Sequence, residues 1–244
     1  APELIEERVV TAHQGVIWIQ GGQVRVHGTI NGRFTVATSG PTTYRMYHTT
    51  LLPIPKLVGR KNNIWITGDL KYADSFLSGE VREGSLNRLG LLSAGHIIVA
   101  NTPANGAGGN ENGHVIINAA MIAMDASFTI QYWQNSTAGY FGDPTDNLIK
   151  GDGYGVIANG GINTGVDDER GMVNIWGSVT QSTRGYLKRN AAGPYNINPG
   201  IGYDKNYNYD YNMRDFPPPA WPENRNSDGS LNMSIAGFGG YDPE

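Results

Sequence analysis

The chain has 244 residues, of which 39% are hydrophobic and 16% are charged, and its formal net charge at pH 7 is -4. This is enough apolar material for one long core or two modest ones. Lys and Arg are scattered, so the sequence has neither the basic patch typical of nucleic-acid binding nor a polybasic membrane-surface segment. It has no cysteine, which excludes disulfides, thiolate metal ligands and thiol nucleophiles.

Glycine is frequent, with 34 residues, and 13 prolines and many Asn and Ser residues accompany it. This composition favours short strands joined by tight turns, because Gly and Asn accept the positive φ angles that turns require. Long helices are not favoured, and the best helical candidate is the short segment 87–92. No apolar stretch is long enough to span a membrane. The chain opens at Ala1-Pro2-Glu3, so we expect a mature product or an ectodomain whose anchor lies outside this sequence.

Short segments of alternating polarity begin near residue 15. In 15–21 (GVIWIQG), Ile17 and Ile19 share one face while Trp18 lies on the other. Segments 63–70 and 172–179 repeat this Ile-Trp pattern. Further strands of this kind are expected at 24–28, 34–38, 90–99, 114–117, 119–123 and 127–130.

Recurring short strands closed by Gly corners predict an all-β fold. We expect a single-stranded right-handed parallel β-helix, a solenoid of stacked coils, because turn signals fall roughly every five to eight residues. A β-sandwich is the alternative, since it also uses many short alternating strands. We expect the β-helix body, with loop insertions, over 1–189 and an extended Tyr/Asn/Pro-rich tail packed on it over 190–244. The tail should not contribute a central strand, because Pro donates no ladder hydrogen bond.

Several motifs in chain order carry a family resemblance: 15–38, 63–74, 89–93, 117–123, 175–181, Arg184-Gly185 and 202–210 with Arg214 and the prolines at 217–219. With these motifs the chain resembles a family of bacterial exported β-helix proteins that is often linked to type IV pili and usually carries a pilin-like N-terminal helix. Tapirins, which are pilus-linked cellulose-binding β-helix proteins, are a more distant comparison. The resemblance covers roughly residues 15–222 and implies an extracellular or cell-surface location, with pilus subunits or further copies of the chain as partners.

Aromatic residues are the main candidates for ligand binding. If the aliphatic neighbours face the core, Trp18, Trp65 and Trp176 point outward from three equivalent strands. Stacked coils lie about 4.8 Å apart, so outward residues in one register would form a ladder suited to the apolar faces of sugar rings. Tyr132 and Trp133 are additional candidates. The alternative is that loops or the tail cover the tryptophans, which would then form a second core.

These residues predict a surface or pilus-associated adhesion protein that binds an insoluble polysaccharide or another cell-surface polymer, and not an enzyme. One alternative is a polysaccharide lyase or hydrolase that uses loop carboxylates. The acidic residues considered for this role are Asp69, Asp74, Asp143, Asp146, Asp152, Asp167, Asp168 and Glu169, for which turn capping is the competing interpretation. Another alternative is an architectural subunit that forms filaments by stacking coil ends or exchanging tails.

We expect no required cofactor. Asn224, Asn226 and Asp228 imitate the start of a Ca²⁺ loop, and Gly229 stands sixth. Ile235, however, occupies the place of the bidentate Glu. Ca²⁺ is therefore a weak expectation at these three residues, and an Asx-rich turn is the competing interpretation.

Overall fold

The computed structural model describes residues 14–48, 52–100, 102–106, 113–131, 168–185, 187–190 and 200–222. Within these ranges the chain is mostly β-strand, arranged as an 11-stranded sheet and a separate two-stranded hairpin. The strands of the large sheet are β1 (Gln14–Gln20), β2 (Val24–Ile30), β3 (Arg33–Ser39), β6 (Ile64–Tyr72), β7 (Arg88–Ser93), β8 (Ile97–Val99), β9 (Val115–Ala123), β10 (Phe128–Ile130), β11 (Asp168–Gln181), β12 (Lys188–Asn190) and β13 (Gly200–Asn208).

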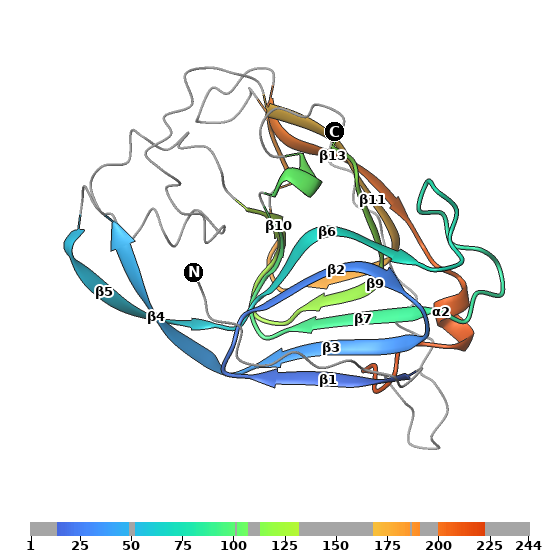
Figure 1. The fold of residues 1–244 in the computed structure, drawn as a ribbon, viewed down its shortest axis with the longest axis horizontal. Coiled ribbons are helices and arrows are strands. Elements are labelled where there is room, and N and C mark those ends of the chain that lie inside the picture. Colours follow the sequence, from blue (N-terminus) through green and yellow to red (C-terminus); the bar gives the residue numbers. More distant parts are fainter. Residues whose placement is uncertain are drawn as a thin grey trace.

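The remaining elements are few. β4 (Pro41–His48) and β5 (Leu52–Lys61) form an antiparallel hairpin that projects away from the large sheet (Figure 1). The helices among the described residues are the 3₁₀ turn η1 (Pro103–Asn105) and the single-turn α2 (Asn212–Asp215). In the described ranges, no helix has the length and apolar character needed to cross a membrane.

The large sheet is parallel except where β12 meets β13. Its strands pair in three ladders, which we number by chain order. The first ladder joins β1, β3, β7 and the C-terminal halves of β9 and β11. The second joins the N-terminal halves of β2 and β6 to β8 and β10. The third joins the C-terminal halves of β2 and β6 to the N-terminal halves of β9 and β11 and to β13. This parallel pairing differs from the antiparallel pairing of the sandwich alternative.

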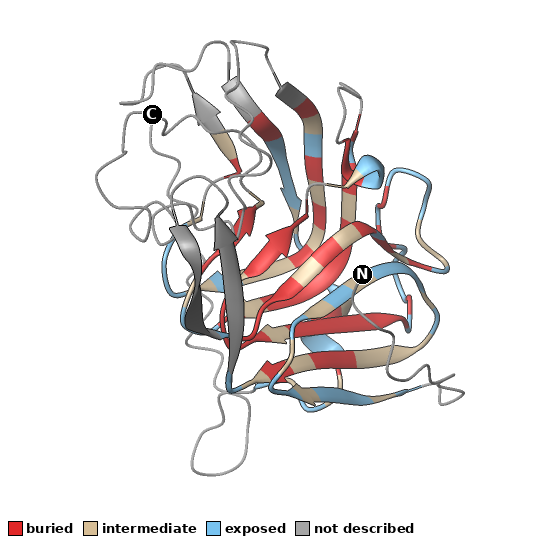
Figure 2. Ribbon diagram, turned by 60° about the vertical axis from the view of Figure 1, so that its left-hand side comes forward, coloured by how far each residue is buried: buried red, intermediate tan, exposed pale blue. Residues whose placement is uncertain are grey.

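Apolar side chains in matching register fill the inside of the ladders. In the second ladder Ile64 and Ile66 are 0% exposed, as are Ile97 and Val99 beside them. The buried positions gather on the central strands, whereas β1 at the end of the stack is largely exposed (Figure 2). Ile17 is therefore 40% exposed although it pairs with the buried Val36, because β3 is the only strand that pairs with β1 among the described residues.

Two local expectations were wrong. Segment 87–92 is not helical but forms most of β7, because parallel pairing with β3 and β9 outweighs its helical pattern. The tail does supply a central strand: β13 lies between β11 and β12 in the sheet. The proline argument fails there because 200–208 contains no Pro.

After α2 the chain returns across β3 and β7. We call residues 216–222 the strap. Arg33 Nη2 donates to the Pro217 carbonyl at 2.9 Å, and Arg88 Nε donates to the Phe216 carbonyl at 2.7 Å. Thr35 Oγ1 donates to the carbonyl of Pro219 at 2.5 Å. Side chains of β3 and β7 thus donate hydrogen bonds to carbonyls of the strap, whose prolines cannot donate hydrogen bonds to a neighbouring strand.

Candidate binding pocket

The three predicted tryptophans do not form an aromatic ladder, so that expectation was wrong. Trp18 lies in β1 on the first ladder, Trp65 in β6 on the second, and Trp176 in β11 on the third. The Ile-Trp segments resemble one another in sequence, but they lie on different ladders. Their side chains therefore face different directions and cannot make one flat platform.

Each tryptophan has its own surroundings. Trp18 is 65% exposed, and its Nε1 donates to Ser39 Oγ at 2.8 Å. Trp65 is half-buried, and its Nε1 donates to Gln23 Oε1 at 2.7 Å. Trp176 is also half-buried and packs against the core. Trp176 lines a pocket, together with residues of the segment that follows β13.

Other predicted site residues fall into two groups. Tyr132, Trp133, Asn224, Asn226 and Asp228 lie outside the described residues, as do Asp143, Asp146, Asp152 and Asp167. Of the described acids, Asp69 accepts a hydrogen bond from the amide of Ile116 at 2.9 Å. Asp74 Oδ1 accepts from Ser85 Oγ at 3.0 Å and Asn87 Nδ2 at 2.8 Å. Asp69 and Asp74 therefore accept hydrogen bonds that stabilise a loop and the beginning of a strand, in agreement with the turn-capping interpretation.

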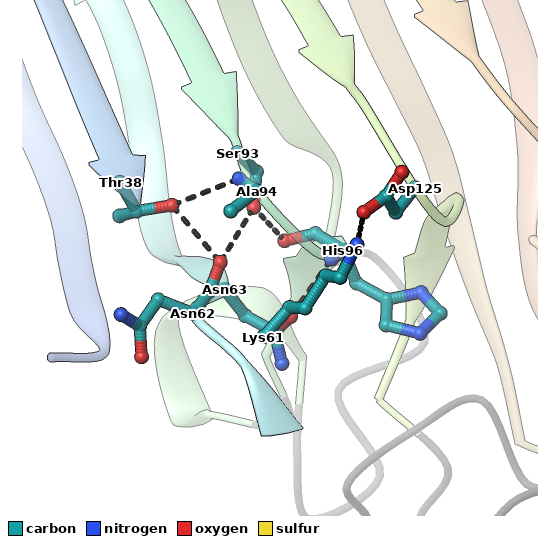
Figure 3. Close-up of polar contacts among 8 residues, drawn as sticks. All are labelled: Thr38, Lys61, Asn62, Asn63, Ser93, Ala94, His96 and Asp125. Carbon is teal, nitrogen blue, oxygen red and sulfur yellow. Dashed lines mark hydrogen bonds and ion pairs between the residues drawn. The ribbon is translucent and has the colours of Figure 1, made fainter. Parts of the chain in front are cut away.

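A polar cluster at the corner between β7 and β8 is structural (Figure 3). The Asn62 carbonyl accepts hydrogen bonds from Thr38 Oγ1 at 2.9 Å and Ser93 Oγ at 3.1 Å. Ser93 Oγ also donates to the backbone carbonyl of His96 at 2.7 Å, not to its ring. Asn63 Oδ1 accepts from the amide of His96 at 2.7 Å. The cluster satisfies backbone groups where the chain turns between strands, and it does not align a serine with a histidine base.

A pocket of about 310 Å³ opens where the 73–87 loop meets the segment between β13 and α2. These two regions lie together at one end of the strands (Figure 1). The pocket is lined by Val81, Glu83, Trp176, Tyr209, Asp210, Tyr211 and Asn212. Trp176 pairs with Asn208 in the third ladder, so the sheet register brings the indole beside the residues that follow β13.

Aromatic rings form the walls of the pocket. The rings of Tyr209 and Tyr211 are 5.2 Å apart between centroids and lie at 86° to each other. Tyr211 is 75% exposed and Tyr209 is 41% exposed. The two tyrosine rings present faces and edges in more than one direction, and Trp176 lines the same cavity, which suits a compact ligand better than a flat one.

The polar groups of the pocket are held in place by Asn212. Its Nδ2 donates to Asp210 Oδ1 at 2.8 Å and to the Arg82 carbonyl at 3.0 Å. Its Oδ1 accepts from the amide of Gly84 at 2.8 Å. One amide side chain therefore ties the 73–87 loop to the segment that carries the tyrosines.

Asp210 is a buried carboxyl group, only 1% exposed. Its Oδ1 accepts from the Asn212 amide at 3.0 Å in addition to the side-chain bond, whereas Oδ2 is buried with no hydrogen-bond partner. Burial raises the pKa of Asp210, and the hydrogen bonds from Asn212 and the charge of Arg88 oppose this rise. Arg88 is itself 0% exposed.

Two tyrosine hydroxyls in this region have raised pKa values. Burial raises the pKa of the Tyr209 hydroxyl, and the neighbouring Asp210 raises it further. The same two causes raise the pKa of the buried Tyr72. Within the described part of the chain, no group of three or more His, Cys, Asp or Glu side chains could hold a metal ion.

Sequence reasoning noted the Tyr-rich tail but assigned no ligand role to Glu83, Tyr209, Tyr211 or Asn212. The run of tyrosines and acids at 203–211 was a usable signal, because a segment that only covers the sheet does not need so many of these residues. Comparisons with protein-family models, with curated proteins and with solved structures found no match to this chain.

Proposed function

We propose that this chain is an extracellular or cell-surface binding protein that takes one sugar unit of a polysaccharide into the pocket. The observation that supports this is the combination of Trp176, Tyr209 and Tyr211 with carboxyl and amide groups in one cavity. A sugar ring has apolar C–H faces and a rim of hydroxyls. Aromatic walls match the faces, and the Glu83 carboxyl group offers hydrogen-bond acceptors to the rim.

The volume of the pocket limits the size of the ligand. Its volume of about 310 Å³ is at the lower end of the range for small-molecule sites. It holds about one ring, so the ligand is a chain end or a side branch and not the flat surface of a crystalline polymer. This differs from the tryptophan platform expected from the sequence, although Trp176 is common to both.

The body that displays this pocket is, in this proposal, a single-stranded right-handed parallel β-helix. Three parallel ladders with matching apolar registers support it, because each strand pairs with strands from the preceding and following passes of the chain. Surface display and association with pili rest on the family resemblance of the sequence motifs.

Binding of soluble oligosaccharides, measured by titration calorimetry, tests the proposal. Tyr211→Ala should weaken binding about fivefold to tenfold, because it removes one aromatic wall. Tyr211 is 75% exposed, so its loss should leave folding unchanged. Trp18→Ala is the matched control, since it removes an exposed aromatic ring outside the pocket. Absence of binding to any oligosaccharide, or equal losses in both variants, would contradict the proposal.

Hydrolysis is a second candidate, because two carboxyl groups, Glu83 and Asp210, line the same cavity. Glycosidases use such a pair, with the acid of raised pKa protonating the leaving group. Burial raises the pKa of Asp210 in the direction this role requires. Release of reducing ends by the wild-type chain, lost in Asp210→Asn while binding persists, would establish hydrolysis over binding alone.

A further inference from the structure

We propose that the pocket selects a protonated amine, so that the bound unit is an amino sugar with a free, charged amino group. This rests on the proposed sugar-binding function and names its ligand class. The proposal comes from three features of the pocket: the arrangement of its rings, the charges of its lining and the unpartnered oxygen of Asp210.

Three aromatic side chains line the cavity. Tyr209 and Tyr211 stand at 86° with centroids 5.2 Å apart, and Trp176 lines the same cavity. Aromatic faces carry negative potential, and rings set around a small space attract an organic ammonium group. A neutral sugar gains from stacking on one aromatic face, but it carries no charge that the negative potential of the aromatic faces could attract.

The charges of the lining have one sign. Glu83 and Asp210 contribute carboxyl groups, and no Lys or Arg is found among the described residues that line the cavity. Three arginines lie nearby, and the charge of one of them, the buried Arg88, partly offsets that of Asp210. Arg82 lies 4.0 Å from the centroid of the Phe76 ring, and Arg214 is paired with Asp215 at 3.1 Å. A uronic acid would meet repulsion here, whereas an ammonium group would be attracted.

Asp210 supplies a specific acceptor. Its side chain is 1% exposed and lines the pocket, yet Oδ2 has no hydrogen-bond partner. A buried acceptor without a donor is unfavourable until a ligand or a water supplies one. An ammonium group brings up to three donors and a charge, so it satisfies this oxygen better than a hydroxyl does.

The test compares three tetrasaccharides that differ at one position of the sugar ring. Calorimetry of the full chain at mildly acidic pH would use glucosamine, N-acetylglucosamine and glucose oligomers. We expect the glucosamine oligomer to bind about tenfold more tightly than the other two. Glu83→Gln should reduce this preference about fivefold, because it removes a charge while keeping the shape of the side chain. Glu80→Gln, an exposed acid of the same loop that does not line the pocket, should leave the preference unchanged.

The outcomes separate the two proposals. Equal affinity for all three oligomers overturns amine selection and leaves sugar binding standing. Binding of none of them overturns both. Binding of choline or of a trimethyl-lysine peptide without binding of the glucosamine oligomer also overturns the inference, because the amine would then be recognised on a different carrier. Equal effects of Glu83→Gln and Glu80→Gln would show that net charge, and not the pocket, produces the preference.

Discussion

The contact between Trp221 and Gly90 allows a sharp test of the strap. A Cβ added at Gly90 would lie 2.6 Å from Trp221 Cζ3, 2.7 Å from its Cε3 and 3.0 Å from Pro218 Cβ. Carbon atoms normally pack at about 3.5–4.0 Å, so Gly90→Ala must push the indole ring by about 1 Å. Hydrogen bonds to the strap carbonyls resist this movement.

The expected magnitude follows from two opposing effects. Overpacking of this kind costs about 1–3 kcal/mol, whereas replacing a glycine within a strand by alanine recovers about 0.5–1 kcal/mol. Gly90→Ala should therefore lower the free energy of unfolding by up to about 2 kcal/mol. In a Trp221→Ala background the obstructing ring is gone, and the same change should be neutral or stabilising by about 0.5 kcal/mol.

Urea unfolding of the wild type, both single variants and the double variant gives the coupling energy between the two positions. We expect a coupling of about 1–3 kcal/mol. Thermal unfolding should show the same sign, with a shift of about 2–4 °C for each kcal/mol. An equal effect of Gly90→Ala in both backgrounds would show that Trp221 does not cover Gly90 in solution.

Two further predictions concern the carboxyl group of Asp210 and Gly177, the residue of β11 that pairs with Ala119 of β9. Because burial raises the pKa of Asp210, the folded chain holds this proton more tightly than the unfolded chain does. The free energy of unfolding should therefore fall as pH rises from the ordinary carboxyl pKa through the raised one, and Asp210→Asn should remove this dependence in urea titrations at a series of pH values. Gly177→Ala would drive a Cβ into the Ala119 carbonyl, so a loss above about 3 kcal/mol is expected by the same assay. Gly22→Ala, whose Cβ meets nothing closer than 3.4 Å, should cost under about 1 kcal/mol, and equal losses at the two glycines would contradict the strand spacing.

The strand interiors were predictable because alternation identifies which residues share a face. Ile64 and Ile66 were expected inward and are 0% exposed, and Val173 and Ile175 are buried in the same way. Parallel stacking was predictable from the spacing of the corners.

The ladder to which each strand belongs was not predictable. Inward and outward side chains alternate with a period of two residues on all three ladders. The similar segments around Trp18 and Trp65 therefore look equivalent in sequence, although they belong to different ladders. The hairpin formed by 41–61 adds chain between β3 and β6 and further disturbs any regular spacing. The prediction of a tryptophan platform was wrong for this reason.

The pocket was hidden because its parts are distant in sequence. Glu83 comes from a loop after β6, Trp176 from β11, and Tyr209 to Asn212 from the segment after β13. Local patterns place each of these on the surface, but only the parallel register of β11 with β13 brings Trp176 beside the tyrosines. The unexpected strand in the tail is thus the element that creates the pocket.

The two tail features, β13 and the strap, explain why a pocket on a connecting segment can hold a defined shape. Residues 209–212 lie between a strand fixed in the sheet and a strap fixed by three side-chain hydrogen bonds. Asn212 adds a third attachment through Arg82 and Gly84. A segment held at both ends and in the middle loses little conformational entropy when a ligand binds, so more of the interaction energy is available as affinity. Exposed tyrosines on such a segment can therefore form a preorganised site even though no long element carries them.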